Sequence, residues 1–365
     1  MSRARAAGMT GLASAMLALS LHTSATAAVE VKPGDVQQAM KDLAKTDGVV
    51  GAIGELYVDG RRQGQGSAGT RLLGGKGGHI PAASRYRVGS QTKLMTATVV
   101  LQLVKEGKLG LGDTLAAVLP QVAQQDLVER AGEITVQQLL RHSSGIPDFF
   151  ASGKFDDAFD FTTYYSPIDL VKASREVPRT GEPGAGFAYS NTNYVLLGLI
   201  VEKVTGRSLS AELERRLFVP LGMKHTYLTT RPPQGVKGPH GHGYHPDAEG
   251  RPRDVDRQNA SFGGAAGGVV STSGDLSAFY RALNQGRLLP ADLQQAVGRP
   301  RPDLCGGTVA AAAGSGPGFL AVTYTSSDGR RQFVVSTTLK IDNQQAMPVN
   351  DAMNKAATTV LCPSR

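Results

Sequence analysis

The chain of 365 residues has little that could cross a membrane. Its longest apolar run, Met9–Leu21, is too short to span a bilayer comfortably, and a membrane anchor is the less favoured alternative. Arg3 and Arg5 precede this run, and the small-x-small pattern Ala25-Thr26-Ala27 follows it. This order is typical of a secretory signal peptide. We therefore expect residues 1–27 to be removed and the protein to be secreted, without stable membrane insertion.

Cysteine is also scarce, because the chain holds only Cys305 and Cys362. In an exported protein, a single pair of cysteines indicates a disulfide. Two buried free thiols or a two-ligand metal site are the alternatives, and neither suits an oxidising compartment as well. The sequence therefore predicts a Cys305–Cys362 disulfide.

Positive charge is present but is not concentrated. Lysines and arginines outnumber acidic residues by 39 to 31, and the net charge is +8, yet the basic residues are scattered along the chain. A nucleic-acid-binding protein more often carries its basic residues in a stripe, so no nucleic-acid partner is predicted. We expect a monomer that acts on a small-molecule or peptide substrate.

Several familiar catalytic and metal motifs are missing. The sequence contains no G-x-S-x-G turn, no H-E-x-x-H motif and no P-loop. His240, His242 and His245 stand close together, but no carboxylate lies at a matching spacing, so we interpret them as loop histidines. We interpret His142 as a structural histidine in a turn. The sequence predicts neither a metal nor a cofactor.

Strand patterns lie near both ends of the chain, and helical patterns lie mainly between them. Apolar, β-prone residues next to turn signals predict strands over Val49–Val58, Phe319–Thr325 and Phe333–Leu339. Helical spacing of apolar residues predicts helices over Gln91–Glu106, Ile134–Arg141, Asn193–Val204 and Ala346–Leu361.

This order predicts an α/β fold, with one antiparallel sheet built from both chain ends, flanked by helices, and a mostly helical lobe inserted between them. We expect a single domain over residues 28–365. Its α/β part would cover about 28–93 and 262–365, and its helical lobe about 94–261. The segment Gln294–Leu304 contains two prolines, which lack ladder donors, so we expect it to pair poorly as a strand.

Ser90 and Lys93 lie three residues apart at the start of the first strong helical pattern. A serine hydroxyl is a poor nucleophile without an adjacent base, and positions i and i+3 share one face of a helix. The lysine amine can therefore reach the serine oxygen. A bare S-x-x-K also recurs by chance, as a helix cap followed by a surface lysine.

Tyr189 and Asn191 form a second candidate pair, in Tyr189-Ser190-Asn191 ahead of another helical pattern. A tyrosine hydroxyl can move protons, and an asparagine amide can hold both a lysine and a substrate carbonyl. The competing explanation is a helix N-cap at Ser190 or Asn191.

Four stretches of the chain resemble serine β-lactamase-like hydrolases of the class C type, in the order Val88–Lys93, Leu140–Pro147, Tyr189–Gly198 and Pro220–Met223. The resemblance runs from about Gly51 to the C-terminus. The group holds class C β-lactamases, secreted DD-peptidases and certain esterases, which share the fold expected above and use no cofactor. The chain looks most similar to soluble secreted D-alanyl-D-alanine carboxypeptidases, which also carry a late cysteine pair.

The resemblance implies a role for each candidate residue. Ser90 would attack a carbonyl and form an acyl-enzyme, while Lys93 and Tyr189 move the protons. Asn191 would orient Lys93 and the substrate amide.

The resemblance also implies a substrate side of the site. The oxyanion would lie between the backbone N–H groups of Ser90 and Ser315. Gly314 and Phe262 are assigned to the same side.

The chain departs from the family at its third motif, which is Lys or His, then a small residue, then Gly. The matching stretch is Ala312-Ala313-Gly314, so the basic residue is missing. This residue normally helps to bind the free carboxylate of a peptidase or β-lactamase substrate, which simple esters lack. Arg299 or Arg301 could supply another cation.

Three functions follow, in order of preference. The first is a D-alanyl-D-alanine carboxypeptidase or transpeptidase acting on D-alanyl peptides of the cell wall. The second is an esterase or β-lactamase with the same nucleophile. The third is a catalytically weak protein that binds penicillin or muropeptides.

Overall fold

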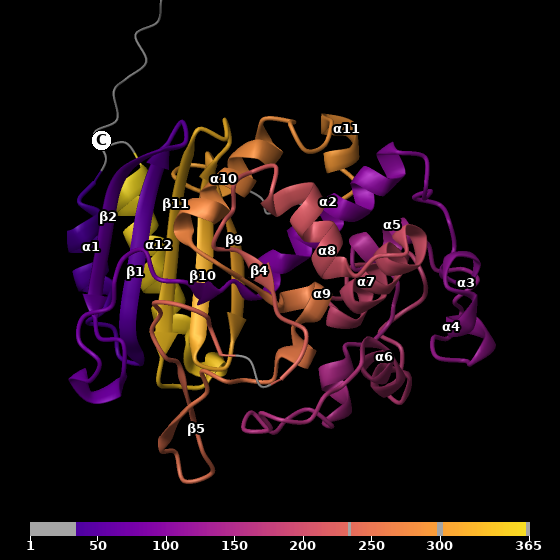
Figure 1. Ribbon diagram of the computed structural model, residues 1–365, viewed down its shortest axis with the longest axis horizontal. Coiled ribbons are helices and arrows are strands. Elements are labelled where there is room, and N and C mark those ends of the chain that lie inside the picture. Colours follow the sequence, from indigo (N-terminus) through magenta and orange to yellow (C-terminus); the bar gives the residue numbers. More distant parts are fainter. Residues whose placement is uncertain (1–33, 233–234, 298–301, 363–365) are drawn as a thin grey trace, which may run out of the picture. The chain divides into compact units, whose positions relative to one another are not determined.

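The central feature of the computed structural model, which describes residues 34–232, 235–297 and 302–362, is a sheet made from both ends of the chain (Figure 1). Its six strands run antiparallel in the order β2-β1-β11-β10-β9-β8. Because β1 pairs directly with β11, the two chain ends close one sheet, as the sequence predicts. The strands are β1 (Val49–Val58), β2 (Arg61–Gly69), β8 (Pro302–Leu304), β9 (Val309–Gly316), β10 (Phe319–Ser326) and β11 (Arg331–Leu339).

Helices cover both faces of this sheet. Helices α1 (Val36–Leu43) and α12 (Met347–Leu361) pack on one face, and α10 (Ser273–Asn284) contacts the other. Strand β10 is buried on both sides: Leu320, Val322 and Tyr324 join the apolar cluster under α1 and α12, and Ala321 joins the opposite cluster. The sheet is therefore a fixed platform for whatever lies at its edges.

A helical region lies beyond the second face of the sheet, on the right in Figure 1. Its central helices, α2 and α7, pack against each other and are apolar nearly all round, as expected for buried helices. The helices of this region are α2 (Thr92–Lys105), α3 (Leu115–Val118), α4 (Pro120–Gln124), α5 (Val136–Leu140), α6 (Pro167–Arg175), α7 (Asn191–Thr205), α8 (Leu209–Leu213) and α9 (Gly264–Gly267).

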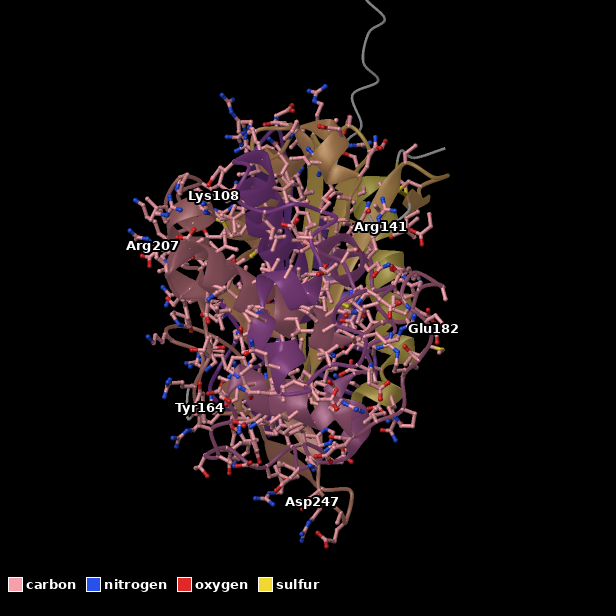
Figure 2. All side chains as sticks on the ribbon, turned by 90° about the vertical axis from the view of Figure 1, so that its right-hand side faces the viewer. Lys108, Arg141, Tyr164, Glu182, Arg207 and Asp247 are labelled. Carbon is pink, nitrogen blue, oxygen red and sulfur yellow. A yellow bond between two sulfur atoms is a disulfide. The ribbon has the colours of Figure 1, made fainter. Side chains whose placement is uncertain are left out.

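Short elements complete the fold. A three-stranded sheet runs in the order β3-β7-β4, and a hairpin of β5 and β6 projects at the bottom of Figure 1. Figure 2 looks onto the helical side and marks this hairpin by Asp247 in its turn. The remaining elements are β3 (Tyr86–Arg87), β4 (Tyr227–Leu228), β5 (Tyr244–Pro246), β6 (Pro252–Asp254), β7 (Val269–Ser271) and α11 (Ala291–Gln294).

The main elements predicted from sequence are present, with shifts of a few residues at their ends. The segment from 294 to 304 needs a correction, because Pro302 and Leu304 pair with β9 as the edge strand β8. An edge strand bonds on one side only, so a residue without an N–H is tolerated there. Arg299 and Arg301 lie outside the described residues, as does the expected signal peptide. Within the described ranges, no helix has the length and apolarity needed to cross a membrane. The division into lobes at 94 and 262 stays a prediction.

The cysteine pair forms the expected disulfide. Cys305 directly follows β8, and Cys362 caps the C-terminal end of α12, with their Cα atoms 5.2 Å apart. The bond therefore ties the edge of the sheet to the helix that covers its first face.

Loss of this disulfide should lower stability. It joins residues 57 apart, and a loop of that length stabilises a fold by roughly 4 kcal/mol in the chain-entropy model. We expect no free thiols in the denatured, unreduced protein, and a double variant, Cys305→Ser with Cys362→Ser, that loses up to about this much unfolding free energy in urea. Two titratable thiols in the untreated protein would contradict the pairing.

Candidate active site

Ser90 lies in a tight turn at the junction of the sheet and the helical region. A single 3₁₀ turn, Gly89–Gln91, leads directly into α2. Gly89 has a φ of +55°, and a Cβ on it would lie 2.6 Å from the Ser315 nitrogen of β9. Glycine is the residue that accepts both conditions. The turn therefore presents Ser90 at the start of a helix and directly beside strand β9.

Three oxygen atoms surround the buried amine of Lys93. Its Nζ lies 3.1 Å from Ser90 Oγ, 2.7 Å from Asn191 Oδ1 and 2.9 Å from the carbonyl oxygen of Ala266. Burial lowers the pKa of Lys93 to about 7, although the charge of Asp148 opposes this shift. A large part of the lysine population is therefore neutral near pH 7.

The hydrogen bonds fix what a neutral Lys93 can do. The Asn191 amide donates through Nδ2 to Asp148 Oδ2 at 2.7 Å, so its Oδ1 faces the lysine as an acceptor. The Ala266 carbonyl can only accept. Both N–H bonds of a neutral amine are thus used, and its lone pair is left for the Ser90 hydroxyl. This is the geometry of a general base next to a nucleophile.

Tyr189 completes the group on the other side of the serine. Its hydroxyl lies 2.7 Å from Ser90 Oγ, and Lys93 Nζ lies 4.8 Å from the centre of its ring. Burial raises the pKa of the Tyr189 hydroxyl above its ordinary value. The phenol is therefore neutral at pH 7, in the form that can donate a proton.

His142 supports Tyr189 and does not face the serine. Its ring stacks on the Tyr189 ring with centroids 4.7 Å apart, and its Nδ1 accepts the Ser190 N–H at 3.2 Å. Burial, together with the nearby charge of Lys93, lowers the pKa of His142 to about 4. A neutral, stacked ring in a turn agrees with the structural role expected from sequence.

Strand β9 forms the opposite wall. A Cβ on Gly314 would lie 2.6 Å from the Ser90 nitrogen, so the strand backbone reaches the serine turn only because residue 314 has no side chain. Ser315 follows, exposed, and lines the cavity. The backbones of Ser90 and Ser315 thus approach each other, as the resemblance implies for two oxyanion donors.

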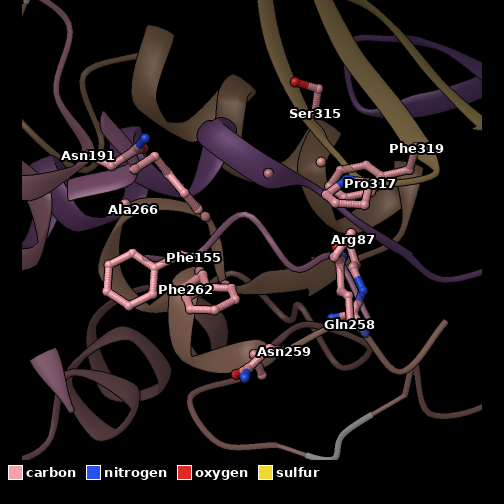
Figure 3. Close-up of a pocket in the computed structure, with 18 of the residues that line it drawn as sticks. Arg87, Phe155, Asn191, Gln258, Asn259, Phe262, Ala266, Ser315, Pro317 and Phe319 are labelled. Atoms are coloured by element: carbon pink, nitrogen blue, oxygen red, sulfur yellow. The ribbon is translucent and has the colours of Figure 1, made fainter. Parts of the chain in front are cut away.

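The cavity in front of Ser90 has a volume of about 650 Å³ (Figure 3). Phe262, predicted on the substrate side, lines it together with Phe150 and Phe155, and the three rings lie in mutual edge or tilted contact. This aromatic wall offers an apolar surface for one end of a substrate.

The charged side chains at the cavity are mainly acidic. Asp156, Asp157 and Asp342 line it, and its basic residues within the described chain are Arg87 and His245. Arg87 is largely buried and donates through Nη2 to the carbonyl oxygen of Asp256.

Ala312 does not line this cavity; it is partly buried and packs against the main apolar cluster. The part of β9 that lines the cavity, Ser315 and Gly316, therefore offers it no cation.

Sequence reasoning missed two groups that act on the Lys93 amine, one directly and one through Asn191. Asp148 immediately follows the Leu140–Pro147 stretch, and its capping contact with the Phe150 N–H is the local signal that could have singled it out. The Ala266 carbonyl belongs to the backbone of α9, and no residue type marks it.

The chain matches the family described as Beta-lactamase over residues 36–334. A match of that extent decides the family. The chain belongs to the beta-lactamase family. The solved structures that it resembles include a D-stereospecific amidohydrolase from Streptomyces sp., which superposes with a TM-score of 0.74 at 31% identity, covering 90% of this chain and 98% of that one.

Two further proteins are similar to the chain, one in fold and one in sequence. The D-amino acid amidase from Ochrobactrum anthropi SV3 superposes with a TM-score of 0.72 at 23% identity, covering 89% of this chain and 97% of that one. Penicillin-binding protein 4 of Amycolatopsis lactamdurans is 35% identical over 195 residues, which are 53% of this chain and 48% of that protein. The chain spans about half the length of this curated relative and about a third or less of the others. The activities of those whole proteins therefore do not transfer to this chain.

The protonation state of Lys93 should determine how kcat/KM changes with pH on the acidic side. Its base form is the neutral amine, so kcat/KM should rise about tenfold per pH unit below 6 and level off above a pH of about 7. Asp148→Asn keeps an acceptor for the Asn191 amide but removes the charge that raises the Lys93 pKa, so the rise in kcat/KM should move to lower pH. Activity that falls as the pH rises through 7 would exclude Lys93 as the base.

The backbone of β9 lies so close to the serine turn that residue 314 has no room for a side chain. Gly314→Ala forces the strand and the serine turn apart, which should cost about 1–3 kcal/mol of stability and at least about 100-fold in kcat/KM. Gly132→Ala is the matched control, because its new methyl group meets nothing within 4 Å. Thermal unfolding and steady-state kinetics measure both effects, and normal activity in the Gly314→Ala variant would refute the close contact.

Proposed function

We propose that the protein is a secreted serine hydrolase that cleaves amides and esters bearing no carboxylate beside the scissile bond, with D-amino acid amides and esters as the favoured class. The observation that carries the proposal is the charge of the site. Strand β9 carries Ala312 at the position where the family has a cation, and three carboxylates line the cavity against one arginine and one histidine, Arg87 and His245. Such a site repels a substrate carboxylate and favours a free ammonium group. The Streptomyces and Ochrobactrum neighbours act, by their names, on D-configured substrates and D-amino acid amides.

The reaction begins at Ser90. Its Oγ bonds to the substrate carbonyl carbon as the hydroxyl proton passes to the lone pair of Lys93, 3.1 Å away. The carbonyl oxygen becomes an oxyanion between the backbone N–H groups of Ser90 and Ser315.

The tetrahedral intermediate then breaks down. The bond to the leaving nitrogen or oxygen breaks, and the leaving atom takes the Tyr189 hydroxyl proton. The proton that Lys93 took from Ser90 then restores the phenol of Tyr189. Water attacks the acyl-enzyme by the same path in reverse. It gives one proton to the relay and returns Ser90 to its hydroxyl form.

D-alanyl-D-alanine carboxypeptidase, the first choice from sequence, is the second candidate. The names of two curated relatives favour it: Penicillin-binding protein 4, and a putative D-alanyl-D-alanine carboxypeptidase of Escherichia coli that is 32% identical over 149 residues, 39% of this chain and 33% of that protein. It stands second because its substrate ends in the carboxylate for which β9 supplies no cation. We also propose that the chain is exported and acts as a monomer.

A substrate panel separates the candidates. Wild type should turn over a D-alanine amide and a neutral p-nitrophenyl ester, and kcat/KM for a D-Ala-D-Ala peptide or a penicillin should be lower. Ala312→His should raise kcat/KM for the carboxylate-bearing substrates only. The expected increase is about ten- to a hundredfold, which corresponds to one charged hydrogen bond.

Ser90→Ala is the control for the whole panel. It should abolish turnover of every substrate and covalent labelling by a fluorophosphonate, since the nucleophile is gone. A wild type that prefers the peptide and ignores Ala312→His would move the assignment to the carboxypeptidase. Stoichiometric penicillin labelling without any turnover would indicate a binding protein instead.

A further inference from the structure

Two histidines and two aspartates meet beside the β5–β6 hairpin, and none of the four lines the cavity in front of Ser90. In the hairpin Tyr244 pairs with Asp254, and the Val255 N–H donates to the Gly243 carbonyl at 2.9 Å. The same antiparallel register continues below the strands and places His242 opposite Asp256. His240 precedes His242 by two residues, which puts both rings on one side of an extended segment.

The side chains converge. One nitrogen of each imidazole and one carboxylate oxygen of Asp256 all lie within 4.8 Å of one another. The two rings are stacked, with centroids 5.1 Å apart and planes 4° from parallel. The side chains of His240 and Asp256 are only 12% and 14% exposed.

The other ring nitrogens are already fixed by acceptors. His240 Nδ1 lies 2.6 Å from the Gly238 carbonyl oxygen, and His242 Nδ1 lies 2.7 Å from Asp254 Oδ2. A carbonyl and a carboxylate can only accept, so both Nδ1 atoms carry the proton. In the neutral rings each Nε2 then holds a lone pair. This is the arrangement by which an outer carboxylate or carbonyl orients a metal-binding histidine.

Within the described chain, one of these nitrogens faces a carboxylate at ion-pair distance. His240 Nε2 is buried and makes no hydrogen bond there, although Asp256 Oδ1 lies 3.1 Å away. The approach is close but lacks the direction of a hydrogen bond. A buried nitrogen lone pair facing a carboxylate oxygen is costly unless a proton or a metal ion lies between them.

We propose that His240, His242 and Asp256 bind a divalent zinc ion, with water completing its coordination. Two imidazoles and one carboxylate form a set that suits Zn²⁺, and tetrahedral geometry needs only small movements from the separations present.

The ion would fix a segment that borders the catalytic cavity. The carbonyl oxygen of Asp256 accepts from Arg87, and Gln258 and Asn259, which follow it, line the cavity. Zinc bound at Asp256 would therefore hold this border in place and act by positioning, apart from the bond-breaking step.

The test uses the untagged protein after treatment with a chelator. Wild type should take up about one equivalent of Zn²⁺ in competition with a chromogenic indicator, and its Tm should rise by about 5 °C with zinc in excess. Co²⁺ should give visible absorption bands of a low-symmetry N/O site, a readout independent of activity.

The variants are chosen to keep the supporting bonds. His240→Asn and His242→Asn each retain an amide N–H in the place of Nδ1 but remove Nε2, and each should weaken zinc binding at least about 100-fold. His79→Asn, a histidine outside the cluster, is the control and should bind as wild type does. Wild type with no Co²⁺ bands, or variants that bind zinc as wild type does, would overturn the proposal and leave a plain His240–Asp256 ion pair.

Discussion

The site depends on one lysine amine held in a place where a positive charge is poorly solvated. Lys93 has three oxygen neighbours but no carboxylate in direct contact, and the nearest negative charge, on Asp148, acts through Asn191. Desolvation outweighs that distant charge, so the amine loses its proton near neutral pH. A carboxylate in direct contact would reverse this balance and keep the lysine charged. Asn191 separates Lys93 from the Asp148 carboxylate, and this separation allows the lysine to act as a base.

This balance requires residues from segments far apart in the chain. Ser90 lies in the turn that leads into α2, and Lys93 lies in the first turn of α2. Asn191 begins α7, and Ser315 belongs to β9. The antiparallel sheet fixes β9, and the packing of α2 against α7 fixes the other two. The site thus lies on the line where the helical region meets the sheet.

The amino-acid pattern predicts the parts of this arrangement that are local. Ser90 and Lys93 share a helical turn, Tyr189 and Asn191 precede a helix, and strand patterns at both chain ends indicate one sheet. It does not predict contacts made by backbone or across a hairpin. The Ala266 carbonyl has no residue signature, and Asp254 and Asp256 reach the histidines only through the register of β5 and β6, which the spacing along the chain conceals. The prolines of the 294–304 segment wrongly suggest that no strand forms there. The free-energy cost of a proline in a strand depends on whether its missing N–H would face a neighbouring strand, which the sequence does not show.

The two edges of the sheet are closed to further strands in different ways. Strand β2 begins with the exposed pair Arg61 and Arg62, and β8 is only three residues long and starts with a proline that has no N–H to offer. Charge, shortness and proline are the means by which natural sheets discourage pairing with a neighbouring chain. The secretory fate proposed for the protein would expose it at high local concentration outside the cell. Edges of this kind would limit aggregation there through sheet extension.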